Sequence, residues 1–255
     1  MPTRVPEPRF IEPVLGVVFD LDGTLVVSRH DFGRMRHEVI RLAERYGVTP
    51  GRLSPEEPLH RILESARDEL RSSETPTTII LRFEAEFHKL IDGIEMQALD
   101  RTTVRAGAPA LLRGLHGRGF RLGLLTRSSE PFTREALSRT HLDRYFSFMR
   151  TRNAPGPAKP SPEALLYLLS EMGVPVERAL YVGDHLIDAE CATRAGVRFY
   201  AVLPDPSESS TMSTDRFLAA GASAIATDLT ELSRQLQIAS PPSEPRPRVA
   251  SATPG

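Results

Sequence analysis

Residues 17–25 read V-V-F-D-L-D-G-T-L, and this segment constrains the fold more than any other part of the chain. A run of Val and Phe that ends at a Gly turn is typical of a strand buried in a parallel sheet. Two carboxylates, Asp20 and Asp22, follow the run and stand one residue apart. Ligands of open α/β sheets bind at the carboxyl ends of the strands, so the segment predicts an α/β fold with acids at that edge.

Two acids at one strand end favour a metal site. Burial of one unpaired carboxylate is costly and a second beside it raises the cost, so a bound cation is the simplest way to keep both ionised. The alternative is a strand that runs into an acidic turn, because Asp and Gly are common turn residues. The segment alone leaves both interpretations open, and the rest of the chain favours the metal.

The composition is that of a globular protein without strong net charge. With 255 residues, 40% of them hydrophobic and 25% charged, the chain can bury one good core and a smaller accessory lobe. The formal net charge is −1, so no electrostatic field attracts nucleic acid or an anionic membrane. We therefore expect neither as a partner.

The cysteine content and the first residues indicate a cytoplasmic protein. Cys191 is the single cysteine, which excludes an internal disulfide and suits a reducing compartment. The first ten residues lack the apolar core of a signal peptide, and no later stretch approaches membrane-spanning length. We expect no export and no membrane anchor.

Strand and helix patterns alternate between two low-complexity ends. Residues 1–13 are expected to form a flexible tail and residues 239–255 a disordered one, because both are rich in residues that do not build a core. The alternation between them predicts a doubly wound, Rossmann-like parallel sheet with covering helices. The predicted strands are residues 16–20, 121–126, 179–184, 198–202 and 224–225.

A helical segment interrupts this alternation. Residues 28–102 are charged and helical in pattern, with prolines at the turns, and we expect them to form a cap domain. The α/β core domain would then consist of residues 14–27 and 103–238, with hinges near residues 26–29 and 101–107. Helices are predicted in the cap over residues 30–46, 59–71 and 77–92, and in the core over residues 109–118 and from Pro162 to Gly173.

Polar residues follow several of the predicted core strands or the loops after them. The carboxyl ends of parallel strands share one edge of the sheet, so residues that are distant in sequence converge there. We expect such a convergence among Asp20 with Asp22, Thr126 with Ser128, Lys159, and Asp184 with Asp188.

Asp184 and Asp188 form the second acidic pair. Asp188 lies four residues after Asp184, at the start of a helix, and this spacing can aim both carboxylates at one cation. An all-oxygen ligand set suits Mg²⁺ better than zinc. The alternative is a helix N-terminus with acids that interact with the helix dipole.

Lys159 and Thr126 are candidate ligands of an anion. Lys159 lies in the loop P-G-P-A-K-P, just before a helix N-terminus that is suited to anions. A loop lysine is usually solvated, but the position between two acidic strand ends favours contact with a phosphate or carboxylate. Thr126 can donate its hydroxyl to the same anion, or it can simply end its strand.

The ordered set of motifs resembles the haloacid dehalogenase (HAD) superfamily of phosphohydrolases. The set is D-L-D-G-T at residues 20–24, a strand ending in Thr126, the isolated Lys159 before a helix, and G-D-x-x-x-D at residues 183–188. The resemblance covers residues 14–236. A helical insert after the first motif is similar to that of the phosphoglycolate phosphatase-like subgroup, whose cap occupies this position.

This resemblance implies a Mg²⁺-dependent phosphatase. Asp20 would be the nucleophile that forms an aspartyl-phosphate, and Asp22 the general acid and then the base for water. The metal would be bound by the Asp20 side chain, the Asp22 backbone carbonyl and Asp184. Asp188 would be a further ligand, directly or through water. Lys159 and the metal would offset the repulsion between carboxylate and phosphate. Asp22 also excludes the dehalogenases, which lack the second acid.

Two positions depart from the subgroup pattern. Arg127 stands where the subgroup usually has Asn, and Val27 replaces an acid. The Arg127 guanidinium could supply a further phosphate contact or point to solvent. His185 lies near the chemistry without an assigned role. Four charged residues of the cap near the expected mouth of the site could bind a substrate anion, but they are predicted to lie on a solvated face, as charged residues of an exposed helix mostly do. They are Arg29, His30, Arg34 and Arg36.

The expected function is hydrolysis of a small phosphomonoester by a monomer or homodimer. Phosphoglycolate is the default substrate by resemblance only, and sugar phosphates and nucleotide monophosphates stay open. One alternative is a sugar phosphomutase of the same superfamily, which needs a cap group that activates the acceptor hydroxyl. The other is a non-catalytic phosphate-binding regulatory module, against which the joint presence of Asp20, Asp22, Lys159 and Asp184 argues.

Overall fold

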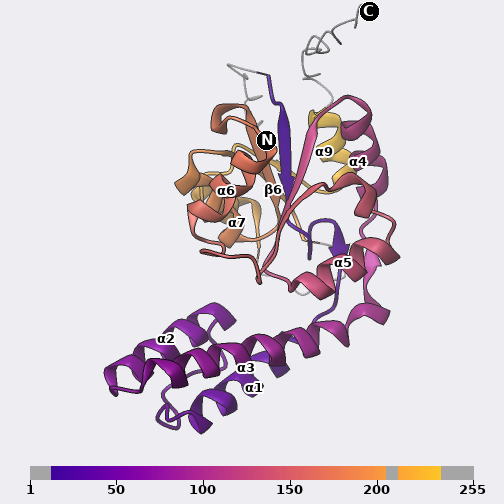
Figure 1. Ribbon diagram of the computed structural model, residues 1–255. Helices are drawn as coiled ribbons and strands as arrows, with labels where there is room; N and C mark the ends of the chain where they lie inside the picture. Colours follow the sequence, from indigo (N-terminus) through magenta and orange to yellow (C-terminus); the bar gives the residue numbers. More distant parts are fainter. Residues whose placement is uncertain (1–12, 205–211, 237–255) are drawn as a thin grey trace, which may run out of the picture.

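The computed structural model describes residues 13–204 and 212–236 of the chain. The predicted tails at residues 1–13 and 239–255 lie almost entirely outside the described residues. In the described part of the chain, a six-stranded sheet carries helices on both faces, and a helical lobe extends from one end of this sheet domain (Figure 1). The predicted doubly wound α/β class is confirmed.

The central sheet is parallel throughout, with the strand order β5-β4-β1-β6-β7-β8. β1 and β6 are neighbours and fully buried, as expected for apolar runs in the middle of a parallel sheet. Phe19 pairs with Val182, so Asp20 emerges beside the end of β6. The strands are β1 Gly16–Phe19, β4 Arg121–Leu125, β5 Phe148–Arg150, β6 Ala179–Gly183, β7 Arg198–Val202 and β8 Ala224–Ala226.

The five strands predicted for the core are all present, whereas β5 was not predicted. Its three residues, F-M-R, are half-buried at the edge of the sheet and show neither a long apolar run nor an alternation.

Two hydrophobic clusters bind the covering helices to the sheet. Leucines of α4 and α9, with Phe132 of α5, pack on one face, and α6, α7 and α8 pack on the other. α6 ends at Gly173, whose φ of +62° is a conformation that glycine adopts without strain. These helices are α4 Ala108–Gly117, α5 Glu130–Arg139, α6 Pro162–Met172, α7 Leu186–Ala195, α8 Thr214–Ala219 and α9 Leu229–Leu236.

The lobe is a bundle of three helices with a hydrophobic core of its own. The bundle consists of α1 Phe32–Arg45, α2 Leu59–Ser72 and α3 Thr77–Met96, close to the predicted positions. Met35, Ile62 and Phe83, one from each helix, are among its buried residues. α3 continues past the predicted end at residue 92.

None of the described helices combines the length and apolar character needed to cross a membrane.

Two short strands connect the lobe to the sheet domain. β2 Val26–Val27 and β3 Thr103–Val104 form an antiparallel pair in which Val26 lies opposite Val104. The chain therefore leaves and returns at neighbouring points, within the two segments predicted as hinges. Arg29, just after β2, has a φ of +54°, which is uncommon for a residue with a side chain.

The separate core of the lobe predicts different effects for two substitutions on α3. Phe83 is fully buried in the lobe, whereas Leu81 is 58% exposed. We expect Phe83→Ala to lower the free energy of unfolding by about 3–5 kcal/mol, because it removes a buried ring and leaves a cavity. Leu81→Ala, the control on the same helix, should change it by less than about 0.5 kcal/mol. Chemical denaturation measures both, and equal losses would contradict this account of the lobe.

Candidate active site

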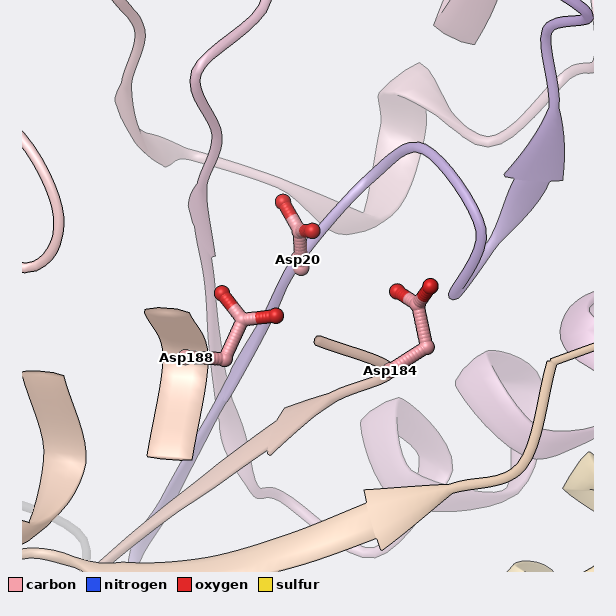
Figure 2. A group of neighbouring side chains, drawn as sticks. All are labelled: Asp20, Asp184 and Asp188. Atoms are coloured by element: carbon pink, nitrogen blue, oxygen red, sulfur yellow. The ribbon is translucent and has the colours of Figure 1, made fainter. Parts of the chain in front are cut away.

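Three carboxylates meet at the carboxyl edge of the sheet. Asp20 follows β1, Asp184 follows β6, and Asp188 lies in the first turn of α7. One oxygen of each lies within 4.8 Å of an oxygen of the other two, and Figure 2 shows the three side chains as neighbours at the strand ends. The structure thus brings together the acids that were expected to converge.

The pKa values show that the cluster resists ionisation without a cation. Burial raises the pKa of Asp20 to about 7; Asp188 adds to this rise, while Lys159 opposes it. Burial, together with the charges of Asp20 and Asp188, also raises the pKa of Asp184 well above its ordinary value. A bound divalent cation would remove this penalty, and an oxygen-only donor set fits Mg²⁺. The residues present therefore fit the metal that was predicted.

The turn after β1 is shaped around Asp184. The Thr24 hydroxyl donates a hydrogen bond of 2.6 Å to Asp184 Oδ1. Gly23 has a φ of +83°, and a Cβ at this position would lie 2.2 Å from Asp184 Oδ2. Glycine is therefore required both by the backbone conformation and by the approach of the carboxylate. Thr24 was not predicted as a site residue, although its place in the D-L-D-G-T motif was a sufficient signal.

Lys159 is buried between two of the carboxylates. Its Nζ lies 2.8 Å from Asp20 Oδ1 and 2.7 Å from Asp188 Oδ1, and 5% of the residue is exposed. Burial alone would lower the pKa of Lys159, but Asp188 and Asp20 outweigh it and raise this pKa above its ordinary value. The ammonium is therefore charged at neutral pH and lies beside the predicted nucleophile.

Asp188 has protein partners at both of its oxygens. Besides Lys159, the Tyr181 hydroxyl donates to Oδ1 at 2.7 Å, and the backbone N–H of His185 donates to Oδ2 at 3.2 Å. Burial, and then the nearby carboxylates, raise the pKa of Tyr181, so the hydroxyl keeps its proton. Tyr181 was not predicted as a site residue, because in the run A-L-Y-V-G it resembles any aromatic residue of a buried strand. The prediction that Asp188 binds a metal stays a prediction.

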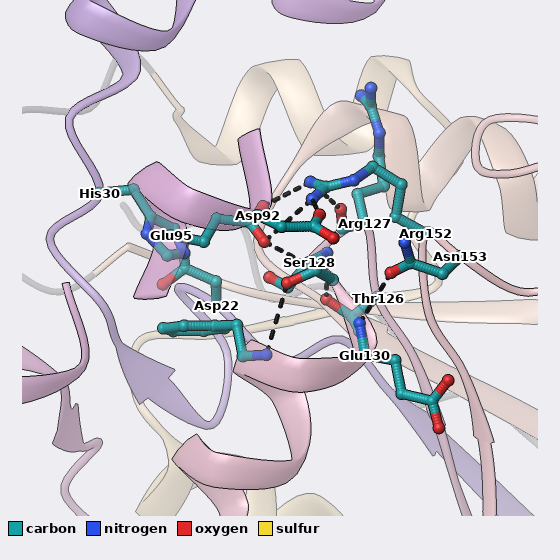
Figure 3. Close-up of polar contacts among 12 residues, drawn as sticks. Asp22, His30, Asp92, Glu95, Thr126, Arg127, Ser128, Glu130, Arg152 and Asn153 are labelled. Carbon is teal, nitrogen blue, oxygen red and sulfur yellow. Dashed lines mark hydrogen bonds and ion pairs between the residues drawn. The ribbon is translucent and has the colours of Figure 1, made fainter. Parts of the chain in front are cut away.

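Asp22 lies beside the acidic cluster but faces the segment that leads to the lobe. Its Oδ1 accepts a hydrogen bond of 2.9 Å from the Ser28 backbone N–H. Its Oδ2 lies 3.8 Å from His30 Nε2 (Figure 3). The His30 side chain is 2% exposed and packs against Phe32 and Phe132. The prediction that His30 lies on a solvated face is therefore wrong. The ring fills the space between the lobe and α5.

Arg29, Arg34 and Arg36, the other residues predicted to lie on a solvated face, differ in their exposure. Arg29 and Arg34 are exposed, as expected, and Arg34 donates a hydrogen bond of 2.8 Å to Gln97. Arg36 is half-buried. His185 has a local role, since its side chain accepts a hydrogen bond of 3.2 Å from the Ile187 N–H and caps α7.

Thr126 and Arg127 end β4 near the cluster. Thr126 is buried, and its Oγ1 accepts a hydrogen bond of 3.1 Å from the Ser128 N–H, which leaves the hydroxyl proton for another acceptor. An Arg127 nitrogen lies 3.3 Å from Nδ1 of His60, at the start of α2. Arg127 is half-buried, which does not decide between its two predicted orientations. Its contact with phosphate stays a prediction.

Burial and the contact with Arg127 determine the charge and the tautomer of the His60 imidazole. Burial, with the charge of Arg127, lowers the pKa of His60 to about 4, so the ring is neutral near pH 7. Because a guanidinium only donates, Nδ1 must accept and Nε2 carries the hydrogen. No carboxylate of the described residues lies within ion-pair distance of Arg127. The lobe and the core thus jointly present hydrogen-bond donors at this boundary.

An ion-pair cluster fastens α3 to the core a short distance away. Arg152, in the loop after β5, forms ion pairs with Asp92 and Glu95 of α3. Glu95, labelled in Figure 3, is buried and also accepts a hydrogen bond of 2.8 Å from the backbone N–H of Ser129, the N-cap residue of α5. The extension of α3 past its predicted end places Glu95 at this contact.

Comparisons with known proteins agree with this arrangement. A model of the haloacid dehalogenase-like hydrolase family matches residues 14–196. Phosphoglycolate phosphatase 1 of Pseudomonas aeruginosa is 31% identical over 199 residues, which cover 73% of this chain and 68% of that protein. The phosphoglycolate phosphatase of Salmonella typhimurium is 30% identical over 201 residues, 73% of this chain and 80% of that protein.

A solved structure supports the fold. The haloacid dehalogenase-like hydrolase of Bacteroides fragilis superposes with a TM-score of 0.62 at 22% identity, over 86% of this chain and 99% of that one. At this identity the superposition supports the fold alone.

The raised carboxylate pKa values predict how stability depends on pH without metal. The pKa of Asp20 is about 7 in the folded chain against an ordinary value of 3.8, so the folded state binds the proton more tightly than the unfolded state. Its contribution to stability is full below the unfolded value and is lost as the pH rises through the folded value. In EDTA, this contribution of Asp20 to the free energy of unfolding should therefore fall, on the order of 2–4 kcal/mol, between about pH 5 and pH 8, whereas His60, with its lowered pKa, contributes a change of opposite sign below pH 7.

Asp184→Asn should reduce this fall, because it removes one of the charges that face Asp20 and keeps an oxygen for Thr24. Added Mg²⁺ should restore the stability of the wild type at pH 8. Asp215→Asn, an exposed residue of α8, is the control and should leave the pH profile unchanged. Chemical denaturation across this pH range measures all three effects. The same pH profile in EDTA for Asp184→Asn and the wild type would contradict the account of the cluster.

Proposed function

This chain belongs to the haloacid dehalogenase-like hydrolases, and we propose that it is a Mg²⁺-dependent phosphatase that hydrolyses a small phosphomonoester through an aspartyl-phosphate. The observation that carries the proposal is the environment of Asp20. One of its oxygens lies 2.8 Å from the Lys159 ammonium, and Asp184 stands beside it as a second carboxylate for a cation. With the Lys159 ammonium on one side and a bound divalent cation on the other, the Asp20 carboxylate could approach an anionic phosphate.

We assign different roles to the two motif acids, and their surroundings support the assignment. Asp20 attacks phosphorus, and the bond from phosphorus to the leaving oxygen breaks as the Asp20–phosphorus bond forms. Asp22, held by the Ser28 N–H outside the acidic cluster, gives its proton to the leaving oxygen. It then takes a proton from the water that attacks the aspartyl-phosphate and releases phosphate.

The remaining groups position the phosphate and its cation. Lys159 and the Thr126 hydroxyl donate to phosphate oxygens. Asp188, which accepts a hydrogen bond from the Tyr181 hydroxyl, holds the Lys159 ammonium in place. Mg²⁺, held by the Asp20 and Asp184 side chains and the Asp22 backbone carbonyl, would supply further positive charge to these oxygens. Asp188 would act as an additional ligand, directly or through water.

We propose that the helical lobe, residues 28–102, is a cap that closes over this edge. The β2–β3 ribbon joins it to the core, and α2, α3 and the segment after β2 contact the core. Closure would exclude bulk water during the first step and admit a water for the second.

The boundary between lobe and core supports a substrate with a second anionic group. Arg127 and the Nε2–H of His60 are donors there, and the guanidinium lacks a carboxylate partner among the described residues. The phosphoglycolate phosphatases found as relatives are named for a substrate that carries a carboxylate next to its phosphate. A phosphorylated small acid of this class is therefore the substrate that the site favours.

Phosphate release tests the proposed activity. We expect the wild type to release phosphate from p-nitrophenyl phosphate and from a panel of phosphomonoesters with Mg²⁺, and to stop in EDTA. Asp20→Asn should lose about 10³-fold or more in kcat, since it removes the nucleophile. Asp68→Asn, an exposed lobe residue, is the matched control and should match the wild type. Unchanged release by Asp20→Asn would contradict the assignment.

A folded protein that binds Mg²⁺ and releases phosphate from no ester would also contradict hydrolysis. Transfer of the phosphoryl group between positions of a sugar phosphate would then indicate the mutase, and binding without turnover the regulatory module.

Substitution of Arg127 tests the substrate class. Arg127→Met should raise KM for phosphoglycolate by about 10-fold or more, because a charge-assisted contact with the carboxylate is lost. The KM for p-nitrophenyl phosphate, which has no second anion, should change less than about threefold. Steady-state kinetics with the two esters measure the contrast. An equal rise for both would assign Arg127 to the phosphate itself.

A further inference from the structure

His30 is a buried imidazole that lacks a hydrogen-bond partner in the described part of the chain. Its side chain is 2% exposed, and neither Nδ1 nor Nε2 has a partner among those residues. The ring is held between Phe32, at a centroid distance of 5.7 Å, and Phe132, at 4.6 Å. Buried polar groups of native proteins are nearly always paired, so an unpaired one beside an active site indicates a partner that arrives in another state.

The candidate partner is Asp22. His30 Nε2 lies 3.8 Å from Asp22 Oδ2, which is beyond hydrogen-bond length. The other oxygen of Asp22 already accepts a hydrogen bond from the Ser28 N–H. A shift of roughly 0.6 Å would bring Nε2 within 3.2 Å of Oδ2 and complete the set of donors around this carboxyl group.

The position of His30 in the chain makes such a shift depend on the lobe. His30 lies between β2 and α1, in the segment that joins the core to the lobe. Phe32 belongs to α1 of the lobe, and Phe132 belongs to α5 of the core. A rotation of the lobe therefore moves the ring relative to Asp22, which is fixed by the turn after β1.

We propose that His30 is a positioning residue that holds Asp22 for proton transfer when the lobe closes. Its Nε2–H then donates to Asp22 Oδ2. As the bond from phosphorus to the leaving oxygen breaks and the Asp20–phosphorus bond forms, the proton of Asp22 moves to the leaving oxygen. The donors of Ser28 and His30 stabilise the carboxylate that results. This inference rests on the proposed phosphatase function and adds a residue to it.

The dependence on the leaving group tests this role. A nitrophenolate departs without a proton, whereas an alkoxide needs one, so loss of an oriented acid affects alkyl esters selectively. We expect His30→Leu, which fills the space without a donor, to lower kcat/KM for the best alkyl phosphate of the panel by about 10–100-fold. For p-nitrophenyl phosphate the loss should stay below about threefold. A ring that serves packing alone would lower both values equally.

Two further variants separate the donor from the packing. His30→Gln places an amide N–H near the position of Nε2, and His30→Asn places it near Nδ1. We expect Gln to recover most of the activity on the alkyl ester and Asn not to recover it. Equal losses on both esters in His30→Leu, or no advantage of Gln over Asn, would overturn the inference. Absence of phosphate release by the wild type would instead refute the proposed function, so the two failures are distinguishable.

Discussion

The carboxyl edge of the sheet depends on the two ion pairs of the buried Lys159 ammonium, one with Asp20 and one with Asp188. Asp20, Asp184 and Asp188 would repel one another strongly in this dry environment, and Lys159 bridges two of them. Its own charge is stable only because both carboxylates are present. With all three carboxylates ionised, the site would carry an excess of negative charge that one divalent cation can neutralise. The architecture of β1, β6 and α7 holds these groups within reach of one another.

Much of this could be predicted from one sequence, because the acids occupy positions with a repeated physical logic. Asp20 and Asp184 each end an apolar run, and in a parallel sheet such ends share one edge. Thr24, Tyr181 and His60 were not predicted, since their roles depend on which side chain lies opposite. The alternation of apolar and polar residues does not indicate that Tyr181 of β6 donates to Asp188, or that His60 of α2 contacts Arg127.

The error at His30 has a similar origin. The segment S-R-H-D between β2 and α1 is polar, and polar segments near helix starts are mostly exposed. Here Phe132 of the core and Phe32 of the lobe cover the ring, and a contact between two parts of a chain does not appear in the local pattern of either. The same limit explains why Arg152, in a loop after an unpredicted strand, could not be assigned to Asp92 and Glu95.

The β2–β3 ribbon has a topological consequence. Val26 and Val104 pair directly, so everything between them is a single excursion that begins and ends at one place. The sheet registers of β1 with β4 and β6 do not depend on the length of that excursion. A lobe with an added or deleted helical turn, or another lobe altogether, could be grafted onto the same ribbon without displacing the carboxylates. The architecture separates the part that holds the reacting carboxylates from the part that can diversify.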